Sequence, residues 1–365
     1  MKINIAKPDI GDEEIEAVSR VMRSGMIASG PETKKFEEEF AEYIGCKYAC
    51  AMTNGTAAIS VALSASGVGP GDEVITTPLT FVATANAILS CGATPVFADI
   101  EEKTFNLCPK STEKAITNKT KAIMPVHIYG LPSNMTEFRK ISEKYDLILI
   151  GDAAQAHGSE INGVKVGQTA DLECFSFYPT KNMTTGEGGM VTTNSRELYH
   201  LVNSIRNHGR PSSTLGTYEY ERFGLNVRLT DISSAIGRVQ LKKLPEMNKK
   251  RAKNAEQLIS TLSDSAEIIL PHTPEGYIHS WHQFTIRVKD RAGLSAYLKE
   301  NEIGVGIYYP RLVYDYSHLS KFKSNCVVAE SLIDEVISLP VHPGLTSSDI
   351  TKISQYVIKW INNKK

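Results

Sequence analysis

Apolar residues near the amino terminus recur with the spacing of an α-helix. Asp12 is a suitable N-cap residue, and Ile15, Val18 and Met22 after it fall on one face of the predicted helix. A second helix is predicted over 31–45, because proline suits its first turn and glycine its end. The chain therefore opens with two amphipathic helices.

Six short apolar runs follow, most of them separated by helical stretches. They are YACAM near Tyr48, EVITT near Glu73, PVFAD near Pro95, KAIMPV near Lys121, LILIGD near Leu147 and CFSFY near Cys174. Runs that are apolar at every position are typical of strands buried on both faces, and their alternation with helices indicates a mostly parallel sheet. In such α/β folds ligands bind beyond the carboxyl ends of the strands. Candidate site residues are therefore sought just after each run.

The later part of the chain has a different order of elements. We expect a long helix over 231–257 interrupted near Pro245, then a strand HQFTIRV, a helix GLSAYLKENE, a strand GVGIYY and a final amphipathic helix from Ser347. A chain of 365 residues exceeds the usual single core. We predict a large domain over 1–244 and a smaller C-terminal α+β domain over 245–365.

Composition limits the classes of function. A net charge of −1 gives no overall field that would gather nucleic acid or anionic lipid. The amino terminus MKINIAKPDIGDEEIE lacks the apolar segment of a signal peptide, and no apolar run approaches the roughly 20 residues that cross a bilayer. The six cysteines are scattered without a CxxC pair, which indicates reduced thiols. We expect a cytoplasmic protein with no nucleic-acid or membrane partner and no metal site.

Two of the candidate site segments follow the first two runs. In NGTAAISVAL, Gly55 and Thr56 open a helix directly after a strand, so free N–H groups, the helix dipole and a hydroxyl meet at one place. That arrangement suits a phosphate or carboxylate, although a tight turn with a threonine cap explains it equally well. In TTPLTFVATANAIL, Phe81 follows a strand and is placed to stack on an aromatic ring, while a core position is the simpler interpretation.

The other two segments contain charged residues. In LILIGDAAQAHG, Asp152 ends a buried strand, where a carboxylate needs a cationic partner such as a protonated pyridine nitrogen; a helix N-cap is the alternative. Gln155 is placed to bond a ring hydroxyl, and His157 is interpreted as structural. In CFSFYPTKNMTTGEGGMV a strand delivers Ser176, and Lys181 lies on the glycine-rich loop beyond it. A lysine that is partly desolvated has the lowered pKa that Schiff-base chemistry requires.

These four signals describe a site for pyridoxal phosphate when they are combined. A phosphate cradle, a stacking aromatic, a carboxylate for a pyridinium and a loop lysine are the groups that this cofactor needs. Each signal alone is weak, and a solvated loop lysine or a capping aspartate is common. The inference depends on all four lying at one edge of one sheet.

The chain also resembles the DegT/DnrJ/EryC1/StrS group of sugar aminotransferases, which have the aspartate-aminotransferase fold (fold type I). The matching stretches, from near residue 25 to near residue 346, are SGPETKKFEEEFAEYIG, NGTAAISVAL, GPGDEVITTPLTFVATANAIL, GATPVFADI, PVHIYG, DAAQAHGS, SFYPTKNMTTGEGGM, GLNVRLTDISSAIGRVQL and ISLPVHPGLT. By position, Lys181 resembles the cofactor lysine, Asp152 the pyridinium partner and Gln155 the ligand of the ring hydroxyl. The remaining cofactor contacts that the resemblance implies are Gly55, Thr56 and Ser176 at the phosphate and Phe81 on the ring.

The resemblance further implies a homodimer with shared active sites. Asn226 is similar to a residue that reaches the phosphate in the neighbouring subunit, and Arg228 is suited to the carboxylate of the amino donor, with a surface salt bridge as the alternative. Relatives contact the sugar nucleotide near Tyr309. Many of them read Tyr-Pro-x-Leu-His there, whereas this chain has valine at 313. The resemblance implies transfer of an amino group from L-glutamate, which leaves as 2-oxoglutarate, to a keto group of a nucleotide-linked sugar.

Two other functions remain open from the sequence. A dehydratase of the same fold would carry histidine at the lysine position or a cysteine-ligated iron–sulfur cluster; here Lys181 is present, and the cysteines lack the cluster spacing. A non-catalytic regulator that binds a nucleotide is the second alternative. The GVGPG stretch lacks the dinucleotide-binding pattern, and no DNA-binding companion domain is evident.

Overall fold

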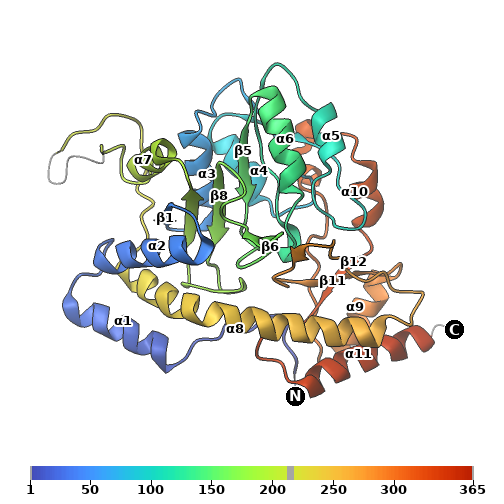
Figure 1. The fold of residues 1–365 in the computed structure, drawn as a ribbon. Helices are drawn as coiled ribbons and strands as arrows, with labels where there is room; N and C mark the ends of the chain where they lie inside the picture. The colour runs from blue at the N-terminus through green and yellow to red at the C-terminus, as the bar shows by residue number, and fades with distance from the viewer. Residues whose placement is uncertain (1, 212–217, 364–365) are drawn as a thin grey trace.

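The computed structural model describes residues 2–211 and 218–363 and is built around one seven-stranded sheet (Figure 1). The strand order is β1-β9-β8-β5-β4-β2-β3, and all strands are parallel except β9. The strands are β1 Tyr48–Met52, β2 Glu73–Thr76, β3 Thr94–Phe97, β4 Thr120–Ile123, β5 Ile148–Asp152, β8 Leu172–Ser176 and β9 Gly189–Thr193. The six predicted strands and the α/β class are confirmed, whereas the antiparallel β9 was not predicted.

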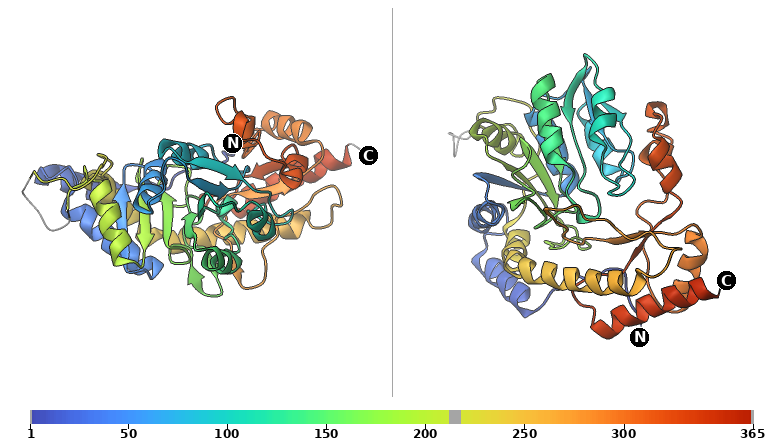
Figure 2. Two further views of the ribbon diagram at one scale, coloured as in Figure 1. Left: turned by 90° about the horizontal axis from the view of Figure 1, so that it is seen from above. Right: turned by 45° about the vertical axis from the view of Figure 1, so that its right-hand side comes forward.

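Helices cover both faces of this sheet (Figure 2). One apolar core joins α3, α4 and α7 to the strands, and separate cores on the other face include residues of α2, α6 and α8. The helices are α1 Asp12–Ser24, α2 Pro31–Ile44, α3 Gly55–Ala65, α4 Ala83–Ser90, α5 Pro109–Lys114, α6 Met135–Tyr145, α7 Arg196–Ile205, α8 Asp231–Leu262, α9 Arg291–Glu300, α10 Val327–Leu332 and α11 Ser347–Asn362, with 3₁₀ turns at η1 Ile128–Gly130, η2 Val313–Asp315 and η3 Ser320–Phe322. No helix within 2–211 and 218–363 is long and apolar enough to cross a membrane.

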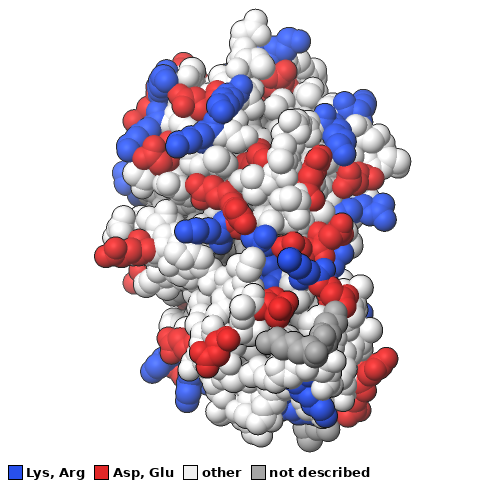
Figure 3. All heavy atoms as spheres, turned by 90° about the vertical axis from the view of Figure 1, so that its right-hand side faces the viewer, with Lys and Arg blue, Asp and Glu red and all other residues white. Residues whose placement is uncertain are grey.

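The C-terminal part has its own apolar core. A two-stranded antiparallel sheet of β11 Phe284–Arg287 and β12 Val336–Leu339 packs with α9, α11 and the end of α8. Three short strands, β6 Glu160–Ile161, β7 Val164–Lys165 and β10 Tyr277–Ile278, form a separate small sheet. On the face drawn in Figure 3, basic and acidic side chains are interspersed, so that face carries no field of a single sign.

The long helix α8 passes without interruption through Pro245, contrary to the interruption we expected there. Proline removes one helical hydrogen bond, but the buried residues Leu244 and Met247 on either side of it pack into the core under α2, which holds the helix together. In Figure 2 the helix extends along the base of the large sheet to α11. The domain boundary near Leu244 stays a prediction.

Two further expectations were wrong. Helix α1 is capped by Gly11 rather than Asp12, and its buried residues are Glu14, Ala17 and Val21. Glu14 meets Lys243 of α8, so the stripe with Ile15 and Met22 faces outward, 60% and 54% exposed. The segment GVGIYY is not a strand: it forms one bridge, from Gly306 to Ser338 of β12.

Candidate active site

Asp152 ends β5 near the middle of the sheet, and its side chain is almost completely buried. One carboxylate oxygen accepts a hydrogen bond from the Thr84 hydroxyl at 2.8 Å, and the other accepts one from the Ala154 N–H at 3.2 Å. Burial raises the pKa of the carboxyl, while these two donors and Lys181 act to lower it. A cation placed beside Asp152 would stabilise the ionised form.

Lys181 lies on the loop that connects β8 to β9. The loop is closed by hydrogen bonds from the Lys181 N–H to the Tyr178 carbonyl and from the Thr184 hydroxyl to the Phe177 carbonyl. Glycine is needed at 188, because a Cβ there would overlap the Thr185 hydroxyl oxygen. Burial lowers the pKa of the Lys181 amine to about 8, and the charge of Asp152 opposes part of this shift. The amine is thus available as a neutral nucleophile near neutral pH.

The amino end of α3 and the carboxyl end of β8 meet closely. A Cβ on Gly55 would lie 2.8 Å from the Cβ of Ser176, so only glycine fits at this contact. Asn54 caps the helix by accepting the Ala57 N–H at 2.8 Å, whereas the N–H groups of Gly55 and Thr56 have no acceptor within the helix. Two backbone donors and the Thr56 and Ser176 hydroxyls thereby gather at a helix start, which is the donor set that suits a phosphate.

Gln155 and Tyr309 connect this edge of the sheet to the C-terminal part. The side-chain oxygen of Gln155 accepts the Tyr129 N–H at 2.7 Å, and its NH₂ group lies 3.3 Å from the Tyr309 hydroxyl, which accepts one of its two protons. One amide proton therefore stays available for a ligand. The ring of Phe81, which is 55% exposed, lies 5.9 Å from that of Tyr309 at a tilt of 36°. Phe81 is therefore not the core residue that its sequence alone suggested.

Asn226 and Arg228 lie at the β1 edge of the sheet. The Arg228 guanidinium donates to the Asn207 side chain at 2.6 Å, and Asn226 is exposed and paired with Asn207 through a backbone bridge. Across 2–211 and 218–363, no hydrogen bond joins either residue to Asp152, Lys181 or Gln155. Arg228 instead lines an open polar pocket of about 340 Å³ with Ser29, Asn203, Arg206, Asn207, His208 and Arg210.

Thr84 is a site residue that the sequence analysis missed. It lies in the first turn of α4, one helical turn after Phe81, and its hydroxyl reaches Asp152. The three-residue spacing of Phe81 and Thr84 in TFVATANAIL is typical of a helix. Nothing in that signal says that the threonine faces a strand 68 positions along the chain, since that proximity depends on the sheet order.

Comparison with known proteins is decisive for the family. The family model of the DegT/DnrJ/EryC1/StrS aminotransferases matches residues 8–358. The chain belongs to this family. It is 36% identical over 353 residues to the UDP-N-acetyl-3-dehydro-alpha-D-glucosamine 3-aminotransferase of Acidithiobacillus ferrooxidans, covering 96% of this chain and 94% of that protein.

Solved members of the DegT/DnrJ/EryC1/StrS family share the fold. DesV of S. venezuelae, solved in complex with a ketimine intermediate, is 35% identical with a TM-score of 0.92 over 95% of this chain and 94% of that one. Spr1654 of Streptococcus pneumoniae, known in PLP and PMP forms, is 28% identical to this chain. Its PMP form gives a TM-score of 0.93 over 100% of both chains. This chain is therefore an enzyme of the sugar aminotransferase family, and that family depends on pyridoxal phosphate.

The geometry fits that cofactor by four independent features. The close approach of Gly55 and Ser176 leaves no room for a larger side chain at the helix start where a phosphate would be bound. Asp152 is a buried carboxylate to which a ring cation would be complementary, and Lys181 lies close enough for its charge to act on Asp152. The second proton of the Gln155 amide is available to a ring oxygen.

Proposed function

We propose that this enzyme moves an amino group from L-glutamate to a keto group of a nucleotide-linked sugar. The observation that carries the proposal is the pair formed by Lys181, whose pKa is lowered to about 8, and the buried Asp152. The substrate class is taken from the Acidithiobacillus relative, whose name is that of a UDP-linked 3-keto-sugar aminotransferase. Glutamate becomes 2-oxoglutarate, and the keto sugar becomes an amino sugar.

In this proposal Lys181 both holds the cofactor and moves a proton. With pyridoxal phosphate bound, its neutral amine would hold the cofactor covalently until the amino donor takes its place. The freed amine then takes a proton from the donor's α-carbon and later delivers one to the sugar carbon, as a general base and acid. Burial favours this role, because an amine with a pKa near 8 exchanges protons readily at neutral pH.

The other site residues orient and stabilise. Pyridoxal phosphate supplies, when bound, a ring that accepts the electron pair left on the substrate carbon. Asp152 holds a proton on the ring nitrogen, and Gln155 donates to the ring hydroxyl oxygen. Gly55, Thr56 and Ser176 bind the phosphate, while Phe81 stacks on the ring. Tyr309, which Gln155 contacts at 3.3 Å, is the proposed contact to the sugar nucleotide.

The active unit in this proposal is a homodimer in which Asn226 and Arg228 complete the partner's site. Two observations support it. The apolar stripe of α1 with Ile15 and Met22 is exposed in the single chain. Arg228 also lines a pocket with Arg206 and Arg210. Burial is the largest cause of the lowered pKa of Arg228, and the charges of the two other arginines lower it further, so an anion would be bound there favourably.

A two-part experiment tests this function. The purified protein, loaded with pyridoxal phosphate, is expected to release 2-oxoglutarate from glutamate and to aminate members of a panel of keto-sugar nucleotides. Borohydride treatment is expected to fix the cofactor on Lys181, identified by peptide mass. Lys181→Ala should abolish both results, whereas Lys165→Ala, a matched lysine change at a peripheral salt bridge, should retain them. Cofactor fixed on another lysine, or turnover by Lys181→Ala, would refute the assignment.

A further inference from the structure

A strap of five residues, His279–Gln283, crosses from the C-terminal part to the predicted cofactor site. Its backbone donates from Ser280 to the Gly130 carbonyl and from Gln283 to the Tyr129 carbonyl, both at 3.0 Å. The Ser280 hydroxyl lies 3.2 Å from the Gly130 carbonyl and 3.3 Å from that of Gln155. The strap thereby contacts the backbone of Gln155 itself and that of Tyr129, whose N–H orients the Gln155 side chain.

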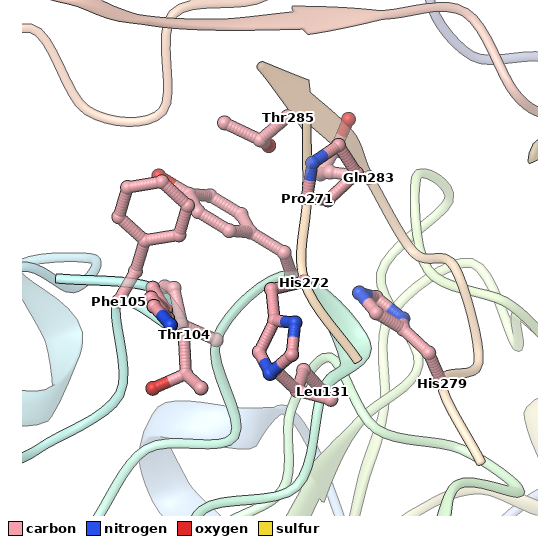
Figure 4. Close-up of a pocket in the computed structure, with 11 residues that line it drawn as sticks. Thr104, Phe105, Leu131, Pro271, His272, His279, Gln283 and Thr285 are labelled. Atoms are coloured by element: carbon pink, nitrogen blue, oxygen red, sulfur yellow. The ribbon is translucent and has the colours of Figure 1, made fainter. Parts of the chain in front are cut away.

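The strap is held in a fixed conformation. Trp281 adopts a positive φ of 51°, and its N–H donates to the His279 ring nitrogen at 2.9 Å. The two rings stack with centroids 4.0 Å apart and an interplanar angle of 2°. Figure 4 shows His279 with Phe105 and His272 around a cavity of about 10 Å³, which has room for roughly one water and no substrate. This cavity is therefore too small to be a substrate site, and the contacts of the strap with the neighbouring segments are its notable feature.

Asn182, which follows the proposed catalytic lysine, connects the lysine loop to the strap by a hydrogen bond to Ser280. Asn182 is 2% exposed, and its NH₂ group donates to the Ser280 carbonyl at 2.7 Å and to the Asn248 side-chain oxygen at 2.9 Å. Both of its amide protons are used. The position of Asn182, and with it the backbone of Lys181, is fixed from outside the loop.

Asn248 comes from α8 and joins two segments of the site. While its oxygen accepts from Asn182, its NH₂ group donates to the His157 carbonyl at 2.8 Å. The next residue, Gly158, has a φ of +77°, and a Cβ there would lie 2.6 Å from the Asn248 nitrogen, so the contact excludes any larger residue. One amide thus ties the loop of Lys181 to the chain that follows Asp152.

We propose that Asn248 is a positioning residue, which acts through Asn182 to hold the Lys181 amine in its buried place beside Asp152. This inference rests on the proposed function only for its catalytic consequence. Without the Asn248 oxygen, one proton of Asn182 loses its acceptor. The lysine loop then keeps its internal hydrogen bonds, the strap and the bond from the Thr184 N–H to the Gln240 side chain, none of which replaces that acceptor. The amine would then be reached by water more easily, which reduces the desolvation that lowers its pKa.

The test is the pH dependence of Lys181 acetylation in the cofactor-free protein, measured by peptide mass spectrometry with acetic anhydride. In the wild type the midpoint is expected near 8. Asn248→Ala should raise it by about one pH unit, toward the ordinary lysine value.

Asn254→Ala is the matched control. Asn254 lies on the same helix and donates to the carbonyls of Val341 and His342 in the C-terminal core, away from the lysine loop. It should leave the midpoint unchanged. An unchanged midpoint in Asn248→Ala, or an equal shift in Asn254→Ala, would overturn the proposal. Should Asn248→Ala fail to fold by circular dichroism, Asn248→Ser replaces it under the same criteria.

The loaded enzyme provides a second measurement. Asn248→Ala is expected to lower kcat by about tenfold or more with KM for the sugar nearly unchanged, because the misplaced amine affects proton transfer and not sugar binding. If no keto sugar is aminated by the wild type, the proposed function fails while the acetylation result still decides the role of Asn248. A raised KM with unchanged kcat would contradict positioning.

Discussion

Burial shifts the pKa values of the two central ionisable groups in the directions that favour their neutral forms. It raises the pKa of Asp152 and lowers that of Lys181 to about 8. Both residues were predicted from sequence, since each follows a strand whose end is recognisable. Thr84, the hydroxyl donor to Asp152, was not, because its proximity comes from the fold and a threonine in a helix has no distinctive pattern.

Thr84→Val tests how Asp152 is kept ionised. Valine has the shape of threonine without the hydroxyl, so the carboxylate loses its 2.8 Å donor and its pKa should rise further. A hydrogen bond to a charged group contributes about 1.5–3 kcal/mol, so kcat is expected to fall roughly tenfold or more.

Asp152→Asn, which cannot hold the ring nitrogen protonated, should retain cofactor and lose most transamination.

Thr80→Val is the control for the Thr84 change. Its hydroxyl contacts that of Thr84 at 2.9 Å, and Asp152 accepts its bonds from Thr84 and Ala154 instead. Thr80→Val therefore removes the same kind of hydroxyl from a residue that does not reach the carboxylate. Steady-state kinetics across pH should show a smaller effect in Thr80→Val than in Thr84→Val. Near-normal turnover by Asp152→Asn would remove the basis of this interpretation.

At the scale of elements, the sequence predicted the six parallel strands because each lies in a short, nearly continuous apolar run. The antiparallel β9 was missed, since GMVTT follows the glycine-rich lysine loop directly and its first residue, Gly189, continues the composition of that loop. The sequence also did not reveal that the apolar stripe of α1 faces outward. Glu14 is buried by bonds to Lys243 and Gln240, so a charged residue takes the inner face, which no hydrophobic pattern reveals.

Strand β8 carries a second buried carboxyl, Glu173. It accepts the N–H groups of Gly167 and Thr169 and thereby anchors the loop before the strand. Burial raises its pKa to about 7 from an ordinary value of 4.5. A raised pKa in the folded state gives stability that is complete below pH 4.5 and is lost as pH rises through 7.

Glu173→Gln should remove this pH dependence. Between pH 4.5 and 7 the free energy of unfolding of the wild type should fall relative to the variant by a total on the order of 3 kcal/mol, at 1.36 kcal/mol for each unit of pKa shift. Urea unfolding at several pH values measures the difference. Glu113→Gln, at an exposed salt bridge with Lys144, is the control and should show little of this trend. Parallel curves for wild type and Glu173→Gln would show that Glu173 titrates normally.

At the scale of the whole molecule, the proposed site is incomplete in one chain. The cradle, Asp152 and Lys181 lie at the carboxyl ends of the central strands, while Asn226 and Arg228 lie at the β1 edge without a bond to them. The exposed apolar residues of α1 provide a surface that association would cover. A twofold dimer would allow each chain to supply these two residues to the other's site.

Mixing two inactive variants tests this shared-site arrangement. Lys181→Ala and the Asn226→Ala/Arg228→Ala double variant should each be inactive, and a mixed dimer would hold one site with both defects and one with neither. At statistical mixing half of the dimers are mixed, so about a quarter of all sites should be active. The measurement is the rate of the mixture after both variants are shown to fold and to exchange subunits. A mixture as inactive as its parents would place Asn226 and Arg228 in their own subunit's site, and the proposal that the active sites are shared would be refuted.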